Sequence, residues 1–278
     1  TKHAAGPPLL QPIRPVGREG STPTMTHNRP IVPTTLVTAK WPTRDNARPL
    51  HGLHVLDAFC CIGGATRGYQ MLGAHVTGVD IAPQPDYCGG EFVQGDAVAF
   101  IAEHGHEFDF IHASPPCQGE CAPTKGTNAA RNTRTGRAHP RLIAPTRAAL
   151  DGTGRPYVIE NVPGSTVRKD VRLCGEMFGL GVLMHRFFEC GGGFIATAPP
   201  HPRHRGRVRG WRHGVYYDGP YVAAYGKGGG KATVAEIQAA KGIDWTSDHH
   251  ALCEALPPAY TRYIGLAVAA ALTERRAA

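Results

Sequence analysis

The sequence predicts an α/β fold built on a doubly wound, mostly parallel sheet. Short apolar runs rich in Val, Ile and Phe alternate with helical segments. Several of these runs end at an acid or at a glycine turn, as strands do at the ligand-binding edge of such a sheet. The 278 residues, 41% of them hydrophobic, suffice for one large domain with a sizeable core, or for a main domain with a small annex.

The predicted elements follow in chain order. Residues 54–59 (HVLDAF) form a buried strand, and residues 60–73 form a glycine turn that opens a helix. Further strands are expected at 74–80, 91–96, 108–114 and 156–162, with a helix over about 141–151 before the last of them. Helices at 231–242 and 260–276 close the chain.

Composition divides the chain into four parts. Residues 1–48 are rich in Pro, Thr and Arg without apolar periodicity, which predicts a disordered tail or an upstream leader with Met25 as a candidate start. Residues 49–189 hold the alternating elements of the main domain. Residues 190–245 are rich in Gly, Arg and Tyr and form the small annex, and residues 246–278 return as helices to the main domain.

The net charge of +8 favours a polyanionic partner. Six Lys or Arg and no acid lie between Cys121 and Arg147, and five Arg and no acid lie in residues 201–213. Such runs are either solvated surface or phosphate contacts, and their position on both sides of a candidate site favours the second interpretation. The eight scattered cysteines indicate reduced thiols, and no apolar run is long enough for a membrane span. We therefore expect an intracellular protein.

A nucleoside-binding site is expected after the first strand. Gly63 and Gly64 permit a tight turn that exposes the free N–H groups of a helix N-terminus. Asp80 ends the second strand, where a carboxylate accepts hydrogen bonds from ribose hydroxyls, although it could instead cap a helix. Asp96 could accept from an exocyclic amine or serve only as a turn aspartate. The spacing GxGxxG is absent, which favours a small nucleoside-type cofactor and speaks against a dehydrogenase.

Cys117 is the candidate nucleophile. Two prolines, Pro115 and Pro116, fix the backbone before it, and a basic loop follows that would favour the thiolate. A buried structural thiol is the alternative. Glu160 ends the fifth strand and should be desolvated enough to hold a proton near neutral pH, unless it is a salt-bridged structural acid. Asn161 is expected to hold neighbouring backbone in place.

Six ordered motifs, LDAFCCIGG, VTGVDI, GDA, SPPCQ, IENVPG and HRFFE, resemble those of the cytosine-5 DNA methyltransferase family, and of its compact phage-type members in particular. The resemblance covers about residues 52–190, with a weaker echo at 252–272. It implies a Rossmann-like S-adenosylmethionine-dependent methyltransferase sheet, with 190–245 as target-recognition annex. It also implies S-adenosylmethionine as cofactor, double-stranded DNA as partner and a monomer in the cytoplasm of a bacterial host cell, a phage being one source of the gene.

The resemblance also implies residue roles. In the cofactor site, Phe59 would contact adenine, the Gly63–Gly64 turn the methionine part, Asp80 the ribose and Asp96 the adenine amine, with Ile81 and Ala97 beside these acids. Cys117 would attack C6 of cytosine, Glu160 would hold N3 and the exocyclic amine, and Arg186 would reach O2, with Pro116 and Asn161 in support. Expected DNA contacts are Gln118, Arg131, Arg134, Arg137, Arg203, Arg205, Arg207 and Arg209.

Three positions depart from the family pattern. A serine four residues after the nucleophile is here Cys121, an arginine two positions before Arg186 is here Met184, and an asparagine of the last helix has Gly265 as its nearest equivalent. The alternatives to a DNA enzyme are a tRNA cytosine-5 methyltransferase and a catalytically silent DNA-binding relative. No metal is expected, because there is no CxxC pair and HPRH (201–204) lacks partners at suitable spacing.

Overall fold

The computed structural model describes residues 48–119, 140–224 and 232–277, all within one compact unit, Thr35–Ala278. The strands are β1 (His54–Ala58), β2 (His75–Asp80), β3 (Glu91–Gln94), β4 (Phe110–Ala113), β5 (Tyr157–Asn161), β6 (Val171–Leu173), β7 (Arg186–Gly191), β8 (Gly210–Arg212) and β9 (Val215–Tyr217). The helices are α1 (Gly64–Gln70), α2 (Ala97–His104), α4 (Ile143–Gly152), α5 (Val234–Lys241), α6 (His249–Glu254) and α7 (Pro258–Ala277), with 3-10 turns η1 (Gly105–Glu107) and η2 (Gly175–Phe178). The predicted tail up to residue 47, Cys121, Arg131, Arg134 and Arg137 lie outside the described residues.

Seven strands form one sheet in the order β3-β2-β1-β4-β5-β7-β6, and β8 pairs with β9 separately. The first five are parallel to their neighbours, in the 3-2-1-4-5 order of a doubly wound sheet. This confirms the predicted Rossmann-like α/β fold and the five predicted strands, whose observed ends lie within two residues of the expected ones.

Two further strands extend the sheet beyond β5. β7 pairs antiparallel with β5, and the three-residue β6 pairs antiparallel with β7. A strand of three residues carries too little periodicity to be recognised in a sequence. The β6–β7 pair places Leu173 opposite Arg186, so the residues just beyond these two positions also face each other.

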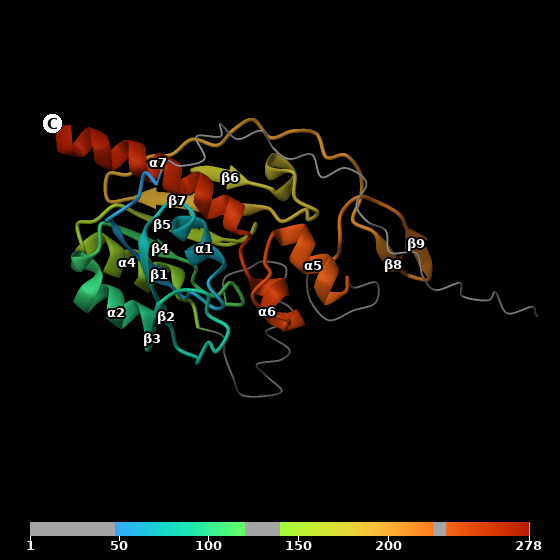
Figure 1. Cartoon of the computed structure of the whole chain (residues 1–278), viewed down its shortest axis with the longest axis horizontal. Coiled ribbons are helices and arrows are strands. Elements are labelled where there is room, and N and C mark those ends of the chain that lie inside the picture. The colour runs from blue at the N-terminus through green and yellow to red at the C-terminus, as the bar shows by residue number, and fades with distance from the viewer. Residues whose placement is uncertain (1–47, 120–139, 225–231, 278) are drawn as a thin grey trace, which may run out of the picture. The chain divides into compact units, whose positions relative to one another are not determined.

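Helices cover both faces of the sheet, with α1 and α7 on one side and α2 and α4 on the other (Figure 1). Phe110 and Ile111 are adjacent on β4 and enter different apolar clusters, the first with Tyr69 of α1 and the second with Leu150 of α4. The central strand β4 is buried at every residue, as expected of a strand covered on both faces, whereas the edge strand β3 is mostly exposed.

The close packing of α7 on α1 depends on glycines. A Cβ atom at Gly68 would lie 2.0 Å from Oγ1 of Thr261, whose hydroxyl donates to the Ala65 carbonyl at 2.8 Å. A Cβ atom at Gly265 would lie 2.6 Å from Cδ1 of Leu72. Gly265, where the resemblance leads one to expect asparagine, therefore serves helix packing.

A third apolar cluster joins the predicted annex to the main domain. It contains Ile62 from the turn after β1, Met184 from the segment before β7 and Ile237 of α5. The predicted domain boundaries stay predictions. None of the helices within the described ranges combines the length and apolarity that a bilayer crossing requires.

Candidate active site

The candidate site lies at the carboxyl ends of β1 and β4, where the strand order reverses. Ligands of doubly wound sheets bind in the crevice at such a reversal. The turn 59–63 leaves β1 at this edge and the segment 114–119 leaves β4. A hydrogen bond of 3.1 Å from the Ser114 amide to the Ala58 carbonyl joins the two exits.

The turn after β1 has an unusual backbone. Phe59 and Cys61 adopt φ angles of +62° and +46°, in a region that residues other than glycine rarely occupy. Gly63 has a φ of +84°. The Asp80 carboxylate holds this backbone by accepting from the Cys61 amide at 3.0 Å. Strain of this kind persists only where the surroundings enforce it, and it is common at ligand sites.

The two glycines of this turn are also required by the protein's own packing. A Cβ atom at Gly63 would lie 2.7 Å from Sγ of Cys88, and one at Gly64 would lie 2.3 Å from the Leu256 carbonyl oxygen. Packing within the protein therefore explains part of the need for glycine at these two positions, without a ligand. The sequence alone could not reveal these packing contacts.

A buried carboxylate, Asp57 of β1, lies beneath the turn. Its Oδ2 accepts from the amide and the hydroxyl of Thr66, at 2.9 and 2.6 Å, whereas its buried Oδ1 has no hydrogen-bond partner among the described residues. Burial is the main cause that raises the pKa of Asp57 to about 7, with smaller contributions from Asp80 and Glu160, while the hydrogen bonds from Thr66 act to lower it. The sequence placed Asp57 near the strand end without giving it a role.

Asp57 should make stability depend on pH. Its pKa is about 7 in the folded chain and near 3.8 when exposed, so the stability it contributes is complete below about pH 4 and is lost as the pH rises towards 7. Asp57→Asn should therefore be more stable than the native chain at pH 8, by a few kcal/mol, and have a flatter profile. Urea denaturation at pH 5 and pH 8 measures this, and equal pH slopes for the two proteins would contradict it.

The structure gives the two other predicted acids different positions. Asp80 is buried, and its Oδ1 accepts from the Ala82 amide at 3.0 Å, so it is held by backbone and does not cap a helix. Asp96 is exposed and caps α2, accepting from the amides of Val98 and Ala99 at 2.8 and 3.1 Å. A cap is a sufficient structural reason for Asp96, and its contact with an adenine amine stays a prediction.

The hydrophobic residues of the predicted cofactor site differ in exposure. Ile81 has 71% of its surface exposed, whereas Ala97, the first residue of α2, is buried. Phe59 is partly buried against the apolar cluster under α2 and α4. Ile81, next to Asp80 in the sequence, and the partly buried Phe59 thus both leave apolar surface accessible.

Cys117 follows the arm that leaves β4 and is itself half-buried. Pro115 is buried, and its carbonyl accepts from Nδ2 of Asn161 at 2.8 Å. The Asn161 side chain also accepts from the Val162 amide at 3.0 Å. Asn161 therefore joins the arm that carries Cys117 to the end of β5, next to Glu160.

Glu160 is buried, with Nε of Arg186 lying 2.9 Å from its Oε1 as an ion pair. Burial raises the pKa of Glu160, while Arg186 and a hydrogen bond from Ser114 offset part of that rise. Arg186 is the first residue of β7, and β7 pairs with β5, the strand that carries Glu160. The sheet therefore brings the two side chains together. The site thus contains a carboxyl group that holds its proton to higher pH than usual.

A buried hydrogen-bonded chain leads from the core to Glu160. The Tyr69 hydroxyl lies 2.9 Å from Nδ1 of His112, and Nε2 of His112 lies 3.0 Å from Oγ of Ser114. Burial lowers the pKa of His112 to about 3, which keeps the ring neutral. Because Ser114 donates to Glu160, the consistent order is Tyr69 to His112 and His112 to Ser114. No role for His112 was expected from the sequence, although a histidine within a buried strand was a signal.

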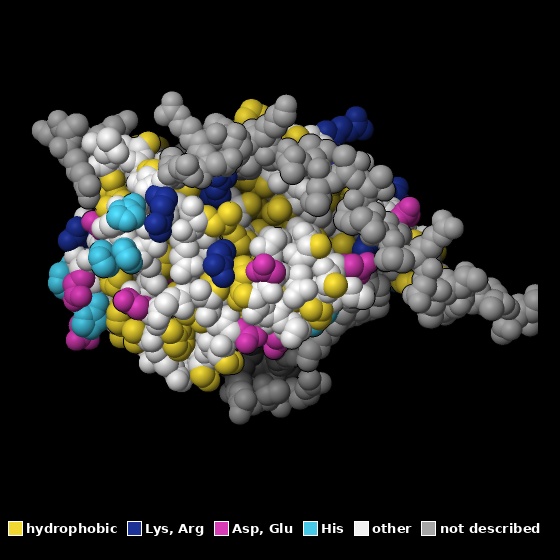
Figure 2. Space-filling model, in the orientation of Figure 1, with side chains coloured by type: hydrophobic (Ala, Val, Ile, Leu, Met, Phe, Trp, Pro, Cys, Tyr) yellow, Lys and Arg dark blue, Asp and Glu magenta, His cyan; other side chains and the backbone are white. Residues whose placement is uncertain are grey.

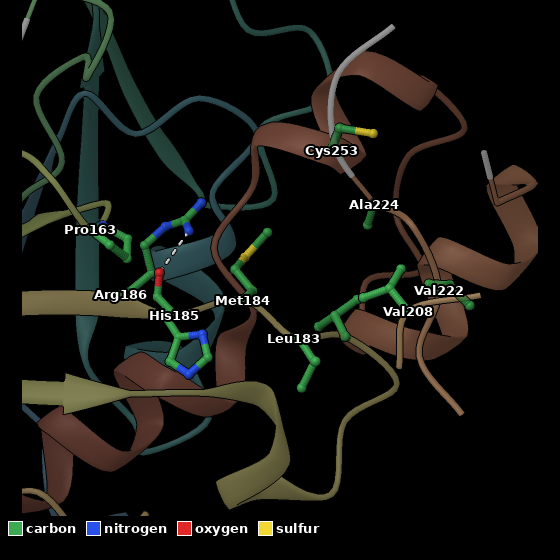
Figure 3. A pocket seen from close by; sticks show the side chains of 10 residues that line it. Pro163, Leu183, Met184, His185, Arg186, Val208, Val222, Ala224 and Cys253 are labelled. Carbon is green, nitrogen blue, oxygen red and sulfur yellow. Dashed lines mark hydrogen bonds between the residues drawn. The ribbon is translucent and has the colours of Figure 1, made fainter. Parts of the chain in front are cut away.

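A cavity of about 290 Å³ adjoins Arg186 and is lined mainly by apolar side chains (Figure 3). Met184, which stands where the resemblance leads one to expect arginine, lies in its wall between Arg186 and Cys253. Neither Cys117 nor Glu160 lines it. The missing arginine thus leaves an apolar wall between the main domain and the annex.

The predicted DNA-contacting arginines of the annex fall into two groups. Arg205 pairs with Glu176 at 2.7 Å, and Arg209 pairs with Glu236. Arg203 and Arg207 are exposed and make no ion pair with a described residue, although Arg207 lies 5.5 Å from the Tyr217 ring centre. Two of these four arginines thus pair with glutamates that are distant in the sequence, although residues 201–213 themselves contain no acid. On the face shown in Figure 2, Lys and Arg side chains are scattered rather than gathered.

HPRH (201–204) has potential partner ligands that its spacing in the sequence did not show, while the expected absence of a metal stays a prediction. Cys174 and His185 lie beside His201 and His204 of HPRH, and one ligand atom from each of the four lies within 4.8 Å of the others. The sequence did not reveal this because the antiparallel β6–β7 pair, which brings Cys174 and His185 together, was not predicted.

No protein-family model and no curated protein matches the chain. Among solved structures, it is similar to the Entamoeba histolytica methyltransferase EhMeth, with 13% identity over 79% of this chain and 98% of that chain and a TM-score of 0.48. It is similar to S. pombe Dnmt2 methyltransferase, with 17% identity over 50% of this chain and 48% of that one and a TM-score of 0.31. It is also similar to magnesium protoporphyrin IX methyltransferase from Synechocystis PCC 6803 with bound SAM, with 21% identity over 41% of this chain and 51% of that one and a TM-score of 0.26. The chain spans about half the length of Dnmt2, and likenesses this weak carry no conclusion about function.

Proposed function

We propose that the chain is an S-adenosylmethionine-dependent methyltransferase that acts on C5 of a cytosine flipped out of duplex DNA, through a transient bond between Cys117 and C6. One observation carries the proposal. The hydrogen bond from Asn161 to the Pro115 carbonyl fixes the arm of Cys117 beside the buried Glu160–Arg186 pair. This supports the proposal because the candidate nucleophile follows β4 and the proton-holding acid lies near the end of β5, the neighbouring parallel strand.

The residues around the β1 turn fit the cofactor. S-adenosylmethionine, when bound, supplies an electrophilic methyl group on a positively charged sulfur. Asp57 has a buried oxygen with no hydrogen-bond partner among the described residues, and Asp80 and Glu160 lie near enough to raise its pKa by repulsion. A cationic ligand would offset that repulsion. Asp80 would hold the ribose, while Phe59 and Ile81 would contact the adenine.

The chain's own residues would perform the following steps. Addition of the Cys117 thiolate to C6 forms an S–C6 bond and breaks the aromaticity of the ring, which makes C5 nucleophilic. Glu160, protonated, donates to N3 and so stabilises the negative charge that enters the ring. After C5 has accepted the methyl group, a general base removes the C5 proton, the S–C6 bond breaks with its electron pair returning to sulfur, and N3 returns its proton to Glu160. The target cytosine must leave the helical stack before these steps, at a cost of about a few kcal/mol.

The test is transfer of a labelled methyl group to duplex DNA and to RNA of the same sequence. We expect label in DNA, released on digestion as 5-methylcytosine, and bisulfite sequencing of DNA from expressing cells would give the target. Label in RNA alone would contradict the DNA substrate and favour the tRNA enzyme. Binding of DNA without any transfer would favour a catalytically silent relative.

The exposed annex arginines should contribute to DNA affinity. Replacing Arg203 and Arg207 together by alanine should weaken duplex binding by roughly 10-fold or more and reduce the slope of log K against log salt by about 2, because each phosphate contact contributes about 0.9. Fluorescence anisotropy over a salt series measures both. Arg48→Ala is the matched control, since this exposed arginine precedes β1, at the opposite strand ends from the crevice. An unchanged slope for the double variant would contradict the assignment.

A further inference from the structure

Four potential metal ligands converge at the junction between β7 and the annex. Cys174 directly follows β6 and His185 directly precedes β7, and the register that pairs Leu173 with Arg186 sets them opposite each other. His201 and His204, three residues apart, return to the same place from the loop after β7. The cluster thus combines segments far apart in the sequence.

Two of the distances between potential ligands in the cluster suit a tetrahedral ion. Nε2 of His185 lies 3.1 Å from Nε2 of His201, and Sγ of Cys174 lies 3.5 Å from Nε2 of His204. A tetrahedral zinc ion with bonds of about 2.05 Å to nitrogen and 2.3 Å to sulfur separates its ligands by about 3.3 Å for two nitrogens and about 3.6 Å for nitrogen and sulfur. Both observed separations are close to these values.

The arrangement of the rings also favours convergence on one point. The His185 and His201 rings stack with centres 5.2 Å apart, and the His204 ring lies 5.2 and 5.0 Å from them. Cys174 is fully buried, and the three histidines are partly exposed. Hydrophobic packing alone does not explain the position of the buried Cys174 thiol, because its neighbours include three polar imidazole rings.

Neighbouring contacts hold the loop that carries the two distal histidines. Arg205, next to His204, pairs with Glu176 at 2.7 Å, and its amide donates to the Tyr221 hydroxyl at 3.0 Å. The Tyr221 hydroxyl also bonds Glu176, which lies two residues after Cys174. Outer contacts of this kind orient ligands at metal sites. Arg205 therefore has a structural partner that explains its position without DNA.

We propose that Cys174, His185, His201 and His204 bind one Zn²⁺ ion as a closed structural site. Four protein ligands leave no open position for chemistry, and a thiolate with imidazoles suits zinc. Binding releases the thiol proton of Cys174 to solvent. The site lies beyond the proposed methyl transfer and does not depend on it.

The site would connect the annex to the active site. The backbone carbonyl of His185 accepts from Nη1 of Arg186 at 3.0 Å, while the His185 ring points away from the guanidinium (Figure 3). One residue thus faces the zinc ligands with its ring and Arg186 with its backbone. Fixing His185 would hold Arg186 against Glu160.

The experiment measures metal in the full chain. Protein expressed with zinc and dialysed against a weak chelator should contain one Zn²⁺ per chain by mass spectrometry. Cys174→Ser and His204→Ala should each bind zinc more weakly, by about 100-fold or more. His106→Ala, an exposed histidine of η1, and Cys190→Ala, a buried thiol of β7, are the matched controls and should keep the ion.

Cobalt substitution makes the test independent of variants that fail to fold. The native chain, stripped and titrated with Co²⁺, should show the intense visible bands of a tetrahedral ion and a sulfur-to-cobalt charge-transfer band at one equivalent. Failure of the stripped native chain to take up one equivalent of Zn²⁺ or Co²⁺ would overturn the proposal and leave the short nitrogen–nitrogen contact as a hydrogen bond between imidazoles. Equal zinc in Cys174→Ser, His204→Ala and native chains would also overturn it.

Discussion

Cys117→Ser is expected to abolish methyl transfer, with a loss in kcat of about 1,000-fold or more. A serine hydroxyl remains protonated at neutral pH and is a far poorer nucleophile than a thiolate towards C6. DNA that carries 5-fluorocytosine gives a second readout. The general base cannot remove fluorine from C5 as it removes a proton, so the S–C6 bond persists. The native chain should therefore form a covalent complex that survives denaturing electrophoresis, and the variant should form none.

The matched control for this prediction is Cys253→Ser. Cys253 lines the cavity beside Arg186 and is buried in α6, so it tests whether any nearby thiol can form the bond. It should be trapped like the native chain. The Cys117→Ser protein should still bind duplex DNA, because its sulfur contributes to the reaction and not to the fold. Trapping of Cys117→Ser at the native level would refute Cys117 as the nucleophile.

Much of the sheet could be predicted because its central strands are buried and rich in apolar residues. Residues 54–58 and 157–161 are buried at nearly every position, and the turn at Gly63 marks the first transition from strand to helix. The edge strand 171–173 was missed because a pairing set by register with a distant strand has no local signal. The convergence of Cys174 and His185 on HPRH (201–204) was missed for the same reason.

The candidate site could be predicted in its residue types but not in its electrostatics. Cys117, Glu160 and Arg186 were expected from motif order, and the structure places Glu160 and Arg186 in contact. The burial of Asp57 and the hydrogen-bonded chain through His112 depend on neighbours 9 to 43 residues away. The pairing of Arg205 with Glu176 likewise required the fold, because local composition shows only an acid-free run.

Glu160→Gln is expected to lower kcat by about 100- to 10,000-fold while leaving DNA binding almost unchanged. The amide can still hydrogen-bond the base, but it has no acidic proton to transfer to N3. Single-turnover rates at saturating DNA measure the effect without contribution from product release. Glu107→Gln is a control for loss of a paired glutamate, since the exposed Glu107 pairs with His104 at 2.9 Å, away from Arg186 and from the proposed zinc ligands. A kcat within about 3-fold of the native value for Glu160→Gln would refute its role as the acid.

Ser114→Ala tests the proton on Glu160 more directly, through pH. Burial raises the pKa of Glu160, and the Ser114 hydrogen bond lowers it by stabilising the carboxylate. Removing the hydroxyl should raise that pKa further. Since activity requires the protonated acid, it falls as the pH rises through this pKa, and the alkaline limb of the profile should move to higher pH in the variant. Ser165→Ala is the matched control, because the buried Ser165 hydroxyl has no hydrogen-bond partner among the described residues and its loss should leave the profile unchanged. An alkaline limb that stays in place in Ser114→Ala, or that moves to lower pH, would show that the proton on Glu160 does not control the rate.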